Sequence, residues 1–307
     1  MTSKPKPIKI KLAGHTDKPG VEFGTAVSAD GVQIRYELKG KGEPTLIFVH
    51  GWCCDRSYWR EQLPYFAKKH RVVAIDLAGH GESSLNRKAW TMDAFGEDVA
   101  AVVAKLGLKH VVLIGHSMGG TVILKTAPKI PRQVIGLVTV DQFYNLEETH
   151  TQKEMDEFIA PFRVNFPEAV SKWVRTIFTP KSDPKLVEWV VAHMSARPPV
   201  VGLGAATEAD GELAFWGNID NCLIRALQKV RAPLVFINSD LQPTPEEINR
   251  RYPPYSNAKI VRGVGHFVML EAPDVFNGLL VATIEEFKRQ ASHAVRSIGC
   301  HESRPIA

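Results

Sequence analysis

Ser117 is the residue whose surroundings in the sequence most clearly predict chemistry. It lies at the centre of a Gly-x-Ser-x-Gly pattern, between Gly115 and Gly119, and the apolar residues 111–114 precede this pattern directly. Such an apolar run is typical of a buried strand, and residues 121–127 continue without a breaker as a predicted helix. The flanking glycines let strand and helix approach closely while the serine adopts a strained conformation. We therefore predict that Ser117 is a nucleophile at a sharp turn between strand and helix.

A serine hydroxyl needs a general base that removes its proton, and histidine most often has this role. The sequence holds 11 histidines. We favour His266, because it follows a predicted buried strand and would emerge at the same sheet edge as Ser117. His116 is adjacent to the serine and must point elsewhere from the same turn. His80 lies between glycines in a turn, where a histidine commonly bonds the backbone, so we expect a structural role for it.

These side chains need a scaffold that brings the ends of several strands together, and the sequence predicts one. Apolar or alternating runs that are typical of strands alternate with stretches that have apolar residues at helical spacing. This alternation predicts an α/β fold with a parallel sheet, helices on both faces and sites at the carboxyl ends of the strands. The predicted strands are residues 32–38, 45–49, 70–76, 111–114, 134–140, 233–240 and 259–266, and the predicted helices are 58–67, 92–106, 121–127, 245–251 and 274–289.

The alternation of strands and helices is interrupted once, after residue 141. Residues 142–216 contain no predicted buried strand and are rich in charged and aromatic residues, so we predict a helical cap there. The core is predicted at residues 21–141 and 217–291. Residues 1–20 are basic and residues 292–307 are polar, so we predict that both ends are flexible tails.

Composition argues against several classes of protein. The chain has 307 residues, 44% of them hydrophobic, which suits a globular protein that builds its core without disulfides. The net charge is +5 and the basic residues are spread along the chain, so nucleic acid is not an expected partner. No run approaches the ~20 apolar residues of a membrane span. The 4 cysteines lack metal-ligand spacing, which favours reduced thiols in the cytoplasm, and no motif predicts a metal ion or an organic cofactor.

Four motifs together resemble an α/β-hydrolase with a helical cap. They are His50-Gly-Trp52, Asp76-Leu-Ala-Gly-His-Gly-Glu-Ser83, Gly115-His-Ser-Met-Gly-Gly120 and Gly265-His-Phe. Each lies where that family places it. The resemblance implies a mostly parallel eight-stranded sheet flanked by helices, with the cap inserted after the sixth strand. Within the family, the pattern is similar to small carboxylesterases and to carbon–carbon-bond hydrolases of ring-cleavage products.

An oxyanion that forms beside Ser117 needs preorganised hydrogen-bond donors. The backbone amide of Met118, the residue after the serine, is one candidate, and the resemblance implies Trp52 as the second. We therefore predict an oxyanion hole at these two residues. Asp76 ends a predicted strand before a glycine-rich turn, and we expect it to cap that turn rather than to react.

The acid that orients His266 is left open between two aspartates. In most of the family an acid follows the next-to-last strand, but this chain has Gln242 at the corresponding place and Asp240 two residues earlier. Asp141 ends the strand after the nucleophile helix, which resembles the place where haloalkane dehalogenases have their acid. We favour Asp141 and keep Asp240 as the alternative.

The residues and the resemblance lead to one main hypothesis about function. It is a serine hydrolase that cleaves small carboxylic esters through an acyl-enzyme on Ser117, with His266 moving the protons. The alternatives are a carbon–carbon-bond hydrolase and a ligand receptor on the same fold with negligible turnover. Epoxide hydrolases and dehalogenases are disfavoured, because they resemble this fold but need an aspartate where Ser117 stands. The sequence predicts no oligomeric state.

Overall fold

A computed structural model describes residues 20–207 and 222–299 and shows an eight-stranded sheet in the order β1-β2-β4-β3-β5-β6-β7-β8. β1 and β4 pair with β2 in antiparallel fashion, and the other pairs are parallel. The prediction of a mostly parallel eight-stranded sheet is confirmed. The strands are β1 Val21–Val27, β2 Gln33–Lys39, β3 Thr45–Val49, β4 Val72–Ile75, β5 Val111–His116, β6 Val134–Val140, β7 Leu234–Ser239 and β8 Tyr255–Val261.

The first strand is the one that sequence periodicity did not reveal. β1 has exposed or half-buried residues at most positions and a glycine, Gly24, in its interior. A Cβ atom on Gly24 would lie 2.2 Å from the hydroxyl of Tyr36 on β2, so the glycine makes room for that ring. Such a strand lacks the apolar signal of a buried strand, because the neighbouring strand supplies the packing.

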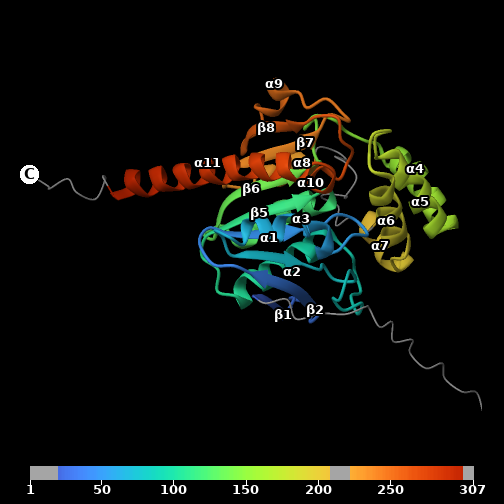
Figure 1. Ribbon diagram of the computed structural model, residues 1–307, viewed down its shortest axis with the longest axis horizontal. Coiled ribbons are helices and arrows are strands. Elements are labelled where there is room, and N and C mark those ends of the chain that lie inside the picture. The colour runs from blue at the N-terminus through green and yellow to red at the C-terminus, as the bar shows by residue number, and fades with distance from the viewer. Residues whose placement is uncertain (1–19, 208–221, 300–307) are drawn as a thin grey trace, which may run out of the picture.

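Helices cover the sheet, with α1 packed against α11 and α2 against α3 (Figure 1). α2 begins after Thr91, whose side chain accepts a hydrogen bond from the backbone N–H of Ala94 as a helix cap. The helices outside the segment between β6 and α8 are η1 Arg56–Trp59, α1 Gln62–Phe66, α2 Met92–Lys105, α3 Met118–Thr126, η2 Ala127–Lys129, α8 Cys222–Leu227, α9 Glu246–Asn249, α10 Val268–Glu271 and α11 Pro273–Gly299.

The last helix corrects the prediction of a flexible tail from residue 292. α11 continues to Gly299, and its final turns extend past the sheet in Figure 1. Residues 290–298 contain neither proline nor glycine, so nothing in the sequence ends the helix before Gly299. Residues 300–307, and residues 1–19 of the basic tail predicted at 1–20, lie outside the described residues. None of the described helices is long and apolar enough to cross a membrane.

Between β6 and α8, the described residues form four further helices, called here the inserted helices. They gather beyond one end of the sheet in Figure 1, at the place where the sequence predicted a cap. Thr151 and Glu154 form a reciprocal capping box at the start of the first of them. The predicted boundaries of the cap and of the second core segment remain predictions, because residues 208–221 lie outside the described residues. The inserted helices are α4 Gln152–Val164, α5 Phe166–Thr176, α6 Pro184–Ser195 and α7 Pro199–Thr207.

The central strands fix the places from which functional side chains emerge. Every residue of β3, β4 and β5 is buried. Close packing of this kind holds the strand ends with little freedom. β3 leads into His50, β5 into Ser117 and β6 into Asp141, so two of the predicted motifs and the favoured acid lie at one edge of the sheet.

Candidate active site

Ser117 lies at the turn between β5 and α3 with a backbone φ of 51°, in the region that favours glycine. The flanking glycines permit this turn. A Cβ atom on Gly115 would lie 2.1 Å from the carbonyl oxygen of Gly119, and one on Gly119 would lie 2.4 Å from that of Val49. The Ser117 amide also donates a hydrogen bond to the carbonyl of Val140, at 2.9 Å. Neighbouring strands thus hold the serine in a conformation that the side chain alone would avoid.

His266 and Asp141 form a direct pair. The Nδ1 atom of His266 lies 2.7 Å from Oδ2 of Asp141, whose side chain is fully buried while that of His266 is 15% exposed. The other carboxylate oxygen of Asp141 accepts a hydrogen bond from the backbone N–H of Ser239. Asp141 has a φ of 51°, which turns the chain sharply at the end of β6. Its carboxylate is therefore fixed by two neighbouring segments and oriented toward the histidine.

Asp240, the alternative acid, is placed differently. It is exposed, and its carboxylate accepts a hydrogen bond from the backbone N–H of Gly263, at 2.8 Å. Gln242, at the usual place of the acid, lines the cavity described below. The structure thus brings Asp141 to His266 and directs Asp240 to the loop after β8.

His116, next to the serine, contacts the backbone and the ring of His266. Its Nε2 lies 3.0 Å from the carbonyl oxygen of His266, and the two ring centroids are 4.6 Å apart. Burial, reinforced by the nearby His266, lowers the pKa of His116 well below its usual value. The neutral His116 ring can therefore donate its Nε2–H to that carbonyl, which accepts but cannot donate.

A cavity of about 300 Å³ joins these groups, and both Ser117 and His266 line it. The structure has no hydrogen bond between the hydroxyl of Ser117 and the ring of His266, and catalytic hydrogen bonds are often loose in sites without substrate. Apolar and polar side chains share the remaining wall. They are Gln142, Phe143, Tyr144, Asn145, Glu148, His150, Trp173, Ile177, Leu223, Leu241 and Gln242, together with Asp141.

The two predicted oxyanion donors occupy distinct settings. Met118 is the first residue of α3, where a backbone N–H has no acceptor within the helix and lies at the positive end of the helix dipole. Trp52 lies in the loop after β3, and its indole N–H donates a hydrogen bond to the carbonyl of Gly202 in α7, at 2.8 Å. Its ring also meets those of Phe162 and Trp173 edge-on. The inserted helices therefore hold the loop that contains Trp52.

His50 fixes the start of that loop. Its Nδ1 is 2.8 Å from the carbonyl oxygen of Gly51, and its Nε2 accepts a hydrogen bond from the N–H of Leu77, at 3.1 Å. Burial lowers the pKa of His50 to about 4. The neutral ring thus uses one nitrogen as a donor and the other as an acceptor, and it ties the loop after β3 to the end of β4.

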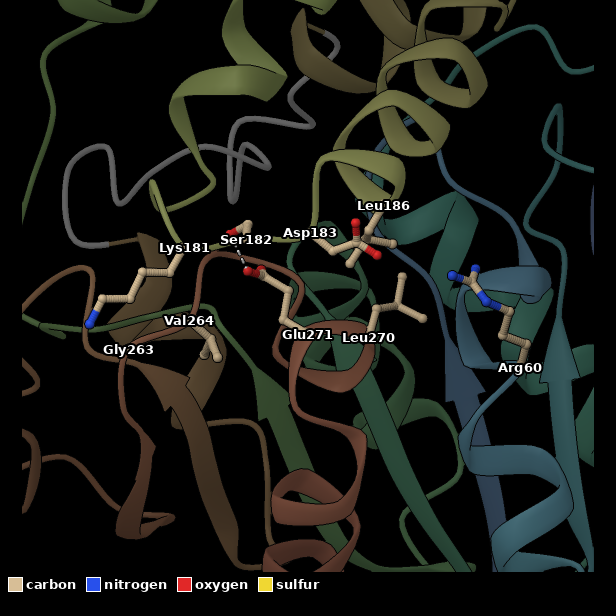
Figure 2. Close-up of a pocket in the computed structure, with 9 residues that line it drawn as sticks. All are labelled: Arg60, Lys181, Ser182, Asp183, Leu186, Gly263, Val264, Leu270 and Glu271. Atoms are coloured by element: carbon tan, nitrogen blue, oxygen red, sulfur yellow. Dashed lines mark hydrogen bonds between the residues drawn. The ribbon is translucent and has the colours of Figure 1, made fainter.

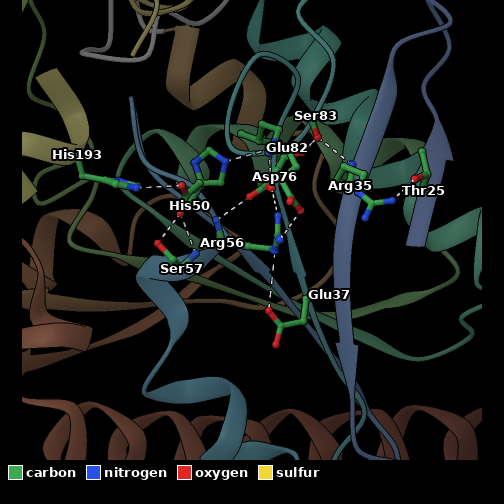
Figure 3. Close-up of polar contacts among 12 residues, drawn as sticks. Thr25, Arg35, Glu37, His50, Arg56, Ser57, Asp76, Glu82, Ser83 and His193 are labelled. Carbon is green, nitrogen blue, oxygen red and sulfur yellow. Dashed lines mark hydrogen bonds and ion pairs between the residues drawn. The ribbon is translucent and has the colours of Figure 1, made fainter. Parts of the chain in front are cut away.

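Asp76 organises the turn after β4, as the sequence predicted. Figure 3 shows its carboxylate beside Arg56, with which it forms an ion pair, and beside Glu82, whose backbone N–H donates to it at 2.9 Å. Burial raises the pKa of Asp76 to about 6, even with the Arg56 guanidinium beside it. His80 contacts the backbone carbonyl of Ala78 through Nδ1, at 2.9 Å, which fits the expected structural role.

Metal-binding side chains and reactive thiols are the other groups that could do chemistry near the site. Within residues 20–207 and 222–299 there is no group of three or more His, Cys, Asp or Glu side chains that could hold a metal ion. Cys53 and Cys54 are fully buried near the site, and burial raises the pKa of both thiols. A buried neutral thiol is a poor nucleophile, so these cysteines act as packing groups.

Sequence reasoning missed two residues close to the predicted groups. Tyr144 lines the cavity with its hydroxyl 3.3 Å from that of Ser239, and burial raises its pKa, with the Asp141 carboxylate adding to the shift. Glu271 binds backbone amides on both sides of His266. Tyr144 follows Asp141 by three residues, which was a usable signal. Glu271 gave none, because a glutamate in a short helix is usually a solvated side chain.

Comparison with known proteins adds the family. The chain is 43% identical over 94 residues to a non-heme haloperoxidase of Rhodococcus erythropolis, a stretch that covers 30% of this chain and 34% of that protein. It is 25% identical over 294 residues to epoxide hydrolase 4 of Mus musculus, covering 88% of this chain and 81% of the mouse protein. The chain spans only about a third of the length of the first curated relatives it matches.

Among solved structures, Est816, described as an N-acyl homoserine lactone degrading enzyme, is 26% identical and superposes with a TM-score of 0.71. That match covers 84% of this chain and 99% of Est816. A sequence model of the alpha/beta hydrolase family matches residues 46–279, which include all the groups described above. This match spans more than half of the chain, and the chain therefore belongs to the alpha/beta hydrolase family.

Proposed function

We propose that the protein is a serine hydrolase that cleaves small carboxylic esters through an acyl-enzyme on Ser117. The observation that carries the proposal is the 2.7 Å contact between Nδ1 of His266 and the buried carboxylate of Asp141, on the wall of a cavity that Ser117 also lines. A nucleophile, a base and an orienting acid around one cavity are the parts that acyl transfer requires.

The proposed mechanism assigns a proton position to each group. Asp141 accepts the Nδ1–H of His266, which leaves the lone pair on Nε2 for the proton of Ser117. The serine oxygen attacks the ester carbonyl, and His266 returns the proton to the departing alcohol. Water then attacks the acyl-enzyme with His266 again as the base, which releases the acid and restores the serine hydroxyl.

The tetrahedral intermediates place negative charge on the former carbonyl oxygen. We propose that the backbone amides of Met118 and Trp52 donate hydrogen bonds to it. The position of Met118 at the first turn of α3 supports this assignment, because helix dipole and amide both favour an anion there. Removing a comparable donor in a serine protease costs about 10²–10³ in kcat.

Relatives help to select the reaction. Est816 is described as degrading a lactone, which is a cyclic ester, and this supports ester cleavage as the reaction class. The likeness to an epoxide hydrolase does not carry its chemistry over, because Ser117 occupies the place where such enzymes need an aspartate nucleophile. The cavity of about 300 Å³ favours small substrates.

The test begins with a fluorophosphonate, which labels an activated serine, and peptide mapping of the adduct. Labelling at Ser117, followed by a burst of nitrophenol from short acyl esters, is the expected result. A panel of acyl chain lengths and lactones then defines the substrate. Labelling without turnover on any ester would favour a ligand receptor, and turnover only on a carbon–carbon substrate would favour the other hydrolase class.

A further inference from the structure

We propose that Glu271 is a positioning residue for His266 and that it couples the inserted helices to this histidine. The proposal rests on the proposed role of His266 as the base. Glu271 ends the short helix α10, which follows the histidine directly, and it takes no part in the reaction steps described above.

The carboxylate of Glu271 holds the backbone on both sides of His266. Its Oε2 atom accepts a hydrogen bond from the N–H of Gly265, at 3.0 Å, and its Oε1 atom accepts one from the N–H of Phe267, at 3.3 Å. Gly265 and Phe267, which provide these donors, are both buried. Hydrogen bonds to a charged acceptor are stronger than neutral ones, so this carboxylate restricts how the loop can present the histidine.

The same carboxylate is bound by the connection between α5 and α6. The hydroxyl of Ser182 donates a hydrogen bond to Oε2 of Glu271, at 2.5 Å, and Figure 2 shows these two side chains facing each other. The carbonyl of Ile177 accepts a hydrogen bond from the N–H of His266, at 2.8 Å. Phe178 also stacks on Phe267, with ring centroids 5.2 Å apart. The connection between α5 and α6 is therefore packed directly against the loop that contains the base.

Gly265 is a further point of close contact between these segments. A Cβ atom on Gly265 would lie 2.7 Å from the carbonyl oxygen of Ile177 and 2.8 Å from Oε1 of Glu271. At Gly265, the loop after β8 is therefore in close contact with both the connection between α5 and α6 and the Glu271 carboxylate. Nδ1 of His266 contacts Asp141, its backbone carbonyl contacts His116, and its backbone N–H donates to the carbonyl of Ile177. Every polar group of His266 except Nε2 therefore has a partner.

Glu271 can be changed without filling or emptying the core. It lines a cavity of about 450 Å³, which Lys181, Asp183 and Arg60 also line (Figure 2). A glutamine there keeps the size of the side chain but replaces one acceptor oxygen with an N–H₂ group, which cannot accept from Gly265 and Ser182. The substitution therefore tests acceptor chemistry rather than packing.

The kinetic test compares Glu271→Gln with the wild type. We expect kcat for a short acyl ester to fall about tenfold with KM nearly unchanged, because a base displaced by a fraction of an ångström reacts more slowly without binding substrate less well. The acid limb of the kcat profile should move as well. Ser182→Ala removes the donor to Glu271, together with the acceptor of the Thr179 N–H, and should lower kcat by about twofold in the same direction.

Glu246→Gln is the matched control. Glu246 also accepts a backbone hydrogen bond, from the N–H of Ala258 at 2.8 Å, but it lies beside β8 and away from His266. The same change of carboxylate to amide there should alter the unfolding midpoint at most, with kcat and the pH profile unchanged. Loss of kcat in Glu246→Gln equal to that in Glu271→Gln would show a general effect of lost stability and overturn the proposal.

A substrate-free readout separates this proposal from the proposed function. The downfield NMR signal of the proton between Nδ1 of His266 and Asp141 should shift or broaden in Glu271→Gln and Ser182→Ala, and stay in place in Glu246→Gln. Absence of ester turnover in the wild type would defeat the proposed function and leave this comparison intact. An unchanged signal in folded Glu271→Gln, or in Ser182→Ala if the first variant does not fold, would overturn the coupling.

Discussion

Two regions along the carboxyl edge of the sheet each contain a histidine and an aspartate, and of these two only the first lines the cavity of Ser117. In the first, Asp141 at the end of β6 pairs with His266 beside Ser117. In the second, at the ends of β3 and β4, His50 and Asp76 lie among fixed partners (Figure 3). The residue types are the same, but their surroundings differ.

The two regions differ in how many hydrogen-bonding atoms of each side chain have a partner within the protein. Both ring nitrogens of His50 have backbone partners, and the ring is fully buried. The carboxylate of Asp76 accepts from two backbone amides and pairs with Arg56. His266, by contrast, uses Nδ1 for Asp141 and remains 15% exposed at the cavity.

This contrast teaches that residue type alone does not identify a reactive group. A side chain whose hydrogen-bonding capacity is spent on the backbone stabilises the loop around it and has nothing left for a substrate. A side chain held at one end and open at the other can exchange protons. The second region therefore builds the scaffold on which the first region is predicted to react.

The largest expected effect is the loss of the Ser117 hydroxyl. Ser117→Ala should lower ester turnover by about 10⁴-fold or more, because no other group replaces the nucleophile, and should leave the unfolding midpoint close to the wild type. The matched control in the second region is Ser83→Ala, whose hydroxyl donates to the carbonyl of Asp76 at 2.6 Å. That change should cost about 1 kcal/mol of stability and little activity. Wild-type turnover by Ser117→Ala would refute the nucleophile assignment.

The next effect concerns the acid that orients the histidine. Asp141→Asn should lower kcat at least about a hundredfold, because an amide reverses the hydrogen-bond preference at Nδ1 while it keeps the shape of the side chain. Combined with His266→Ala, it should add almost nothing, since the two residues act as a unit. Steady-state kinetics on one ester decide this, and additive losses in the double variant would separate Asp141 from the base.

The sequence allowed much of the first region to be predicted, because its signals are local. The glycines around Ser117 and the apolar run before it specify a turn at one place in the chain. The buried strands were recognisable from short apolar runs for the same reason. β1 was missed because its packing comes from Tyr36 on a neighbouring strand, and the helical extension to Gly299 was missed because helix propensity was weighed less than polarity.

The parts that depend on distance in space could not be derived in the same way. The choice between Asp141 and Asp240 turns on which strand end faces the loop after β8, and the ends of adjacent parallel strands lie close together. The support of His266 by Ser182 and Glu271 joins residues 89 positions apart, with no pattern in the sequence that links them.

The buried histidines should make the stability of the folded protein fall in acid. This effect distinguishes them from His266, which is partly exposed at the cavity. Burial lowers the pKa of His50, His80 and His116, so the folded protein holds these rings neutral while the unfolded chain takes up a proton on each. The stabilising effect is complete above pH ~6.5 and is lost as pH falls toward the folded-state values. Between pH ~7.5 and ~5.5, His50 alone should cost about 1.4 kcal/mol, a tenfold change in the unfolding equilibrium, and His80 and His116 should act in the same direction.

Urea unfolding at the two pH values measures this effect, with His50→Asn as the comparison. The variant should be less stable overall, since it loses the contacts to Gly51 and Leu77. The number of protons taken up on unfolding should fall by one, so its free energy of unfolding should change less with pH. Equal stability of the wild type at both pH values would mean that these rings titrate in the folded protein as they do in the unfolded chain.

The smallest expected effect is that of Asp240→Asn. Asparagine keeps an acceptor oxygen for the N–H of Gly263, so the bond at 2.8 Å persists without its charge, and the side chain is exposed to solvent. Gly263 lies in the loop that contains His266, and a slightly looser loop should lower kcat by less than about tenfold. A loss as severe as that of Asp141→Asn would instead mean that Asp240 reaches His266 during turnover. The double variant, measured at the same pH, would then show strong non-additivity between the two aspartates, because they would share one histidine.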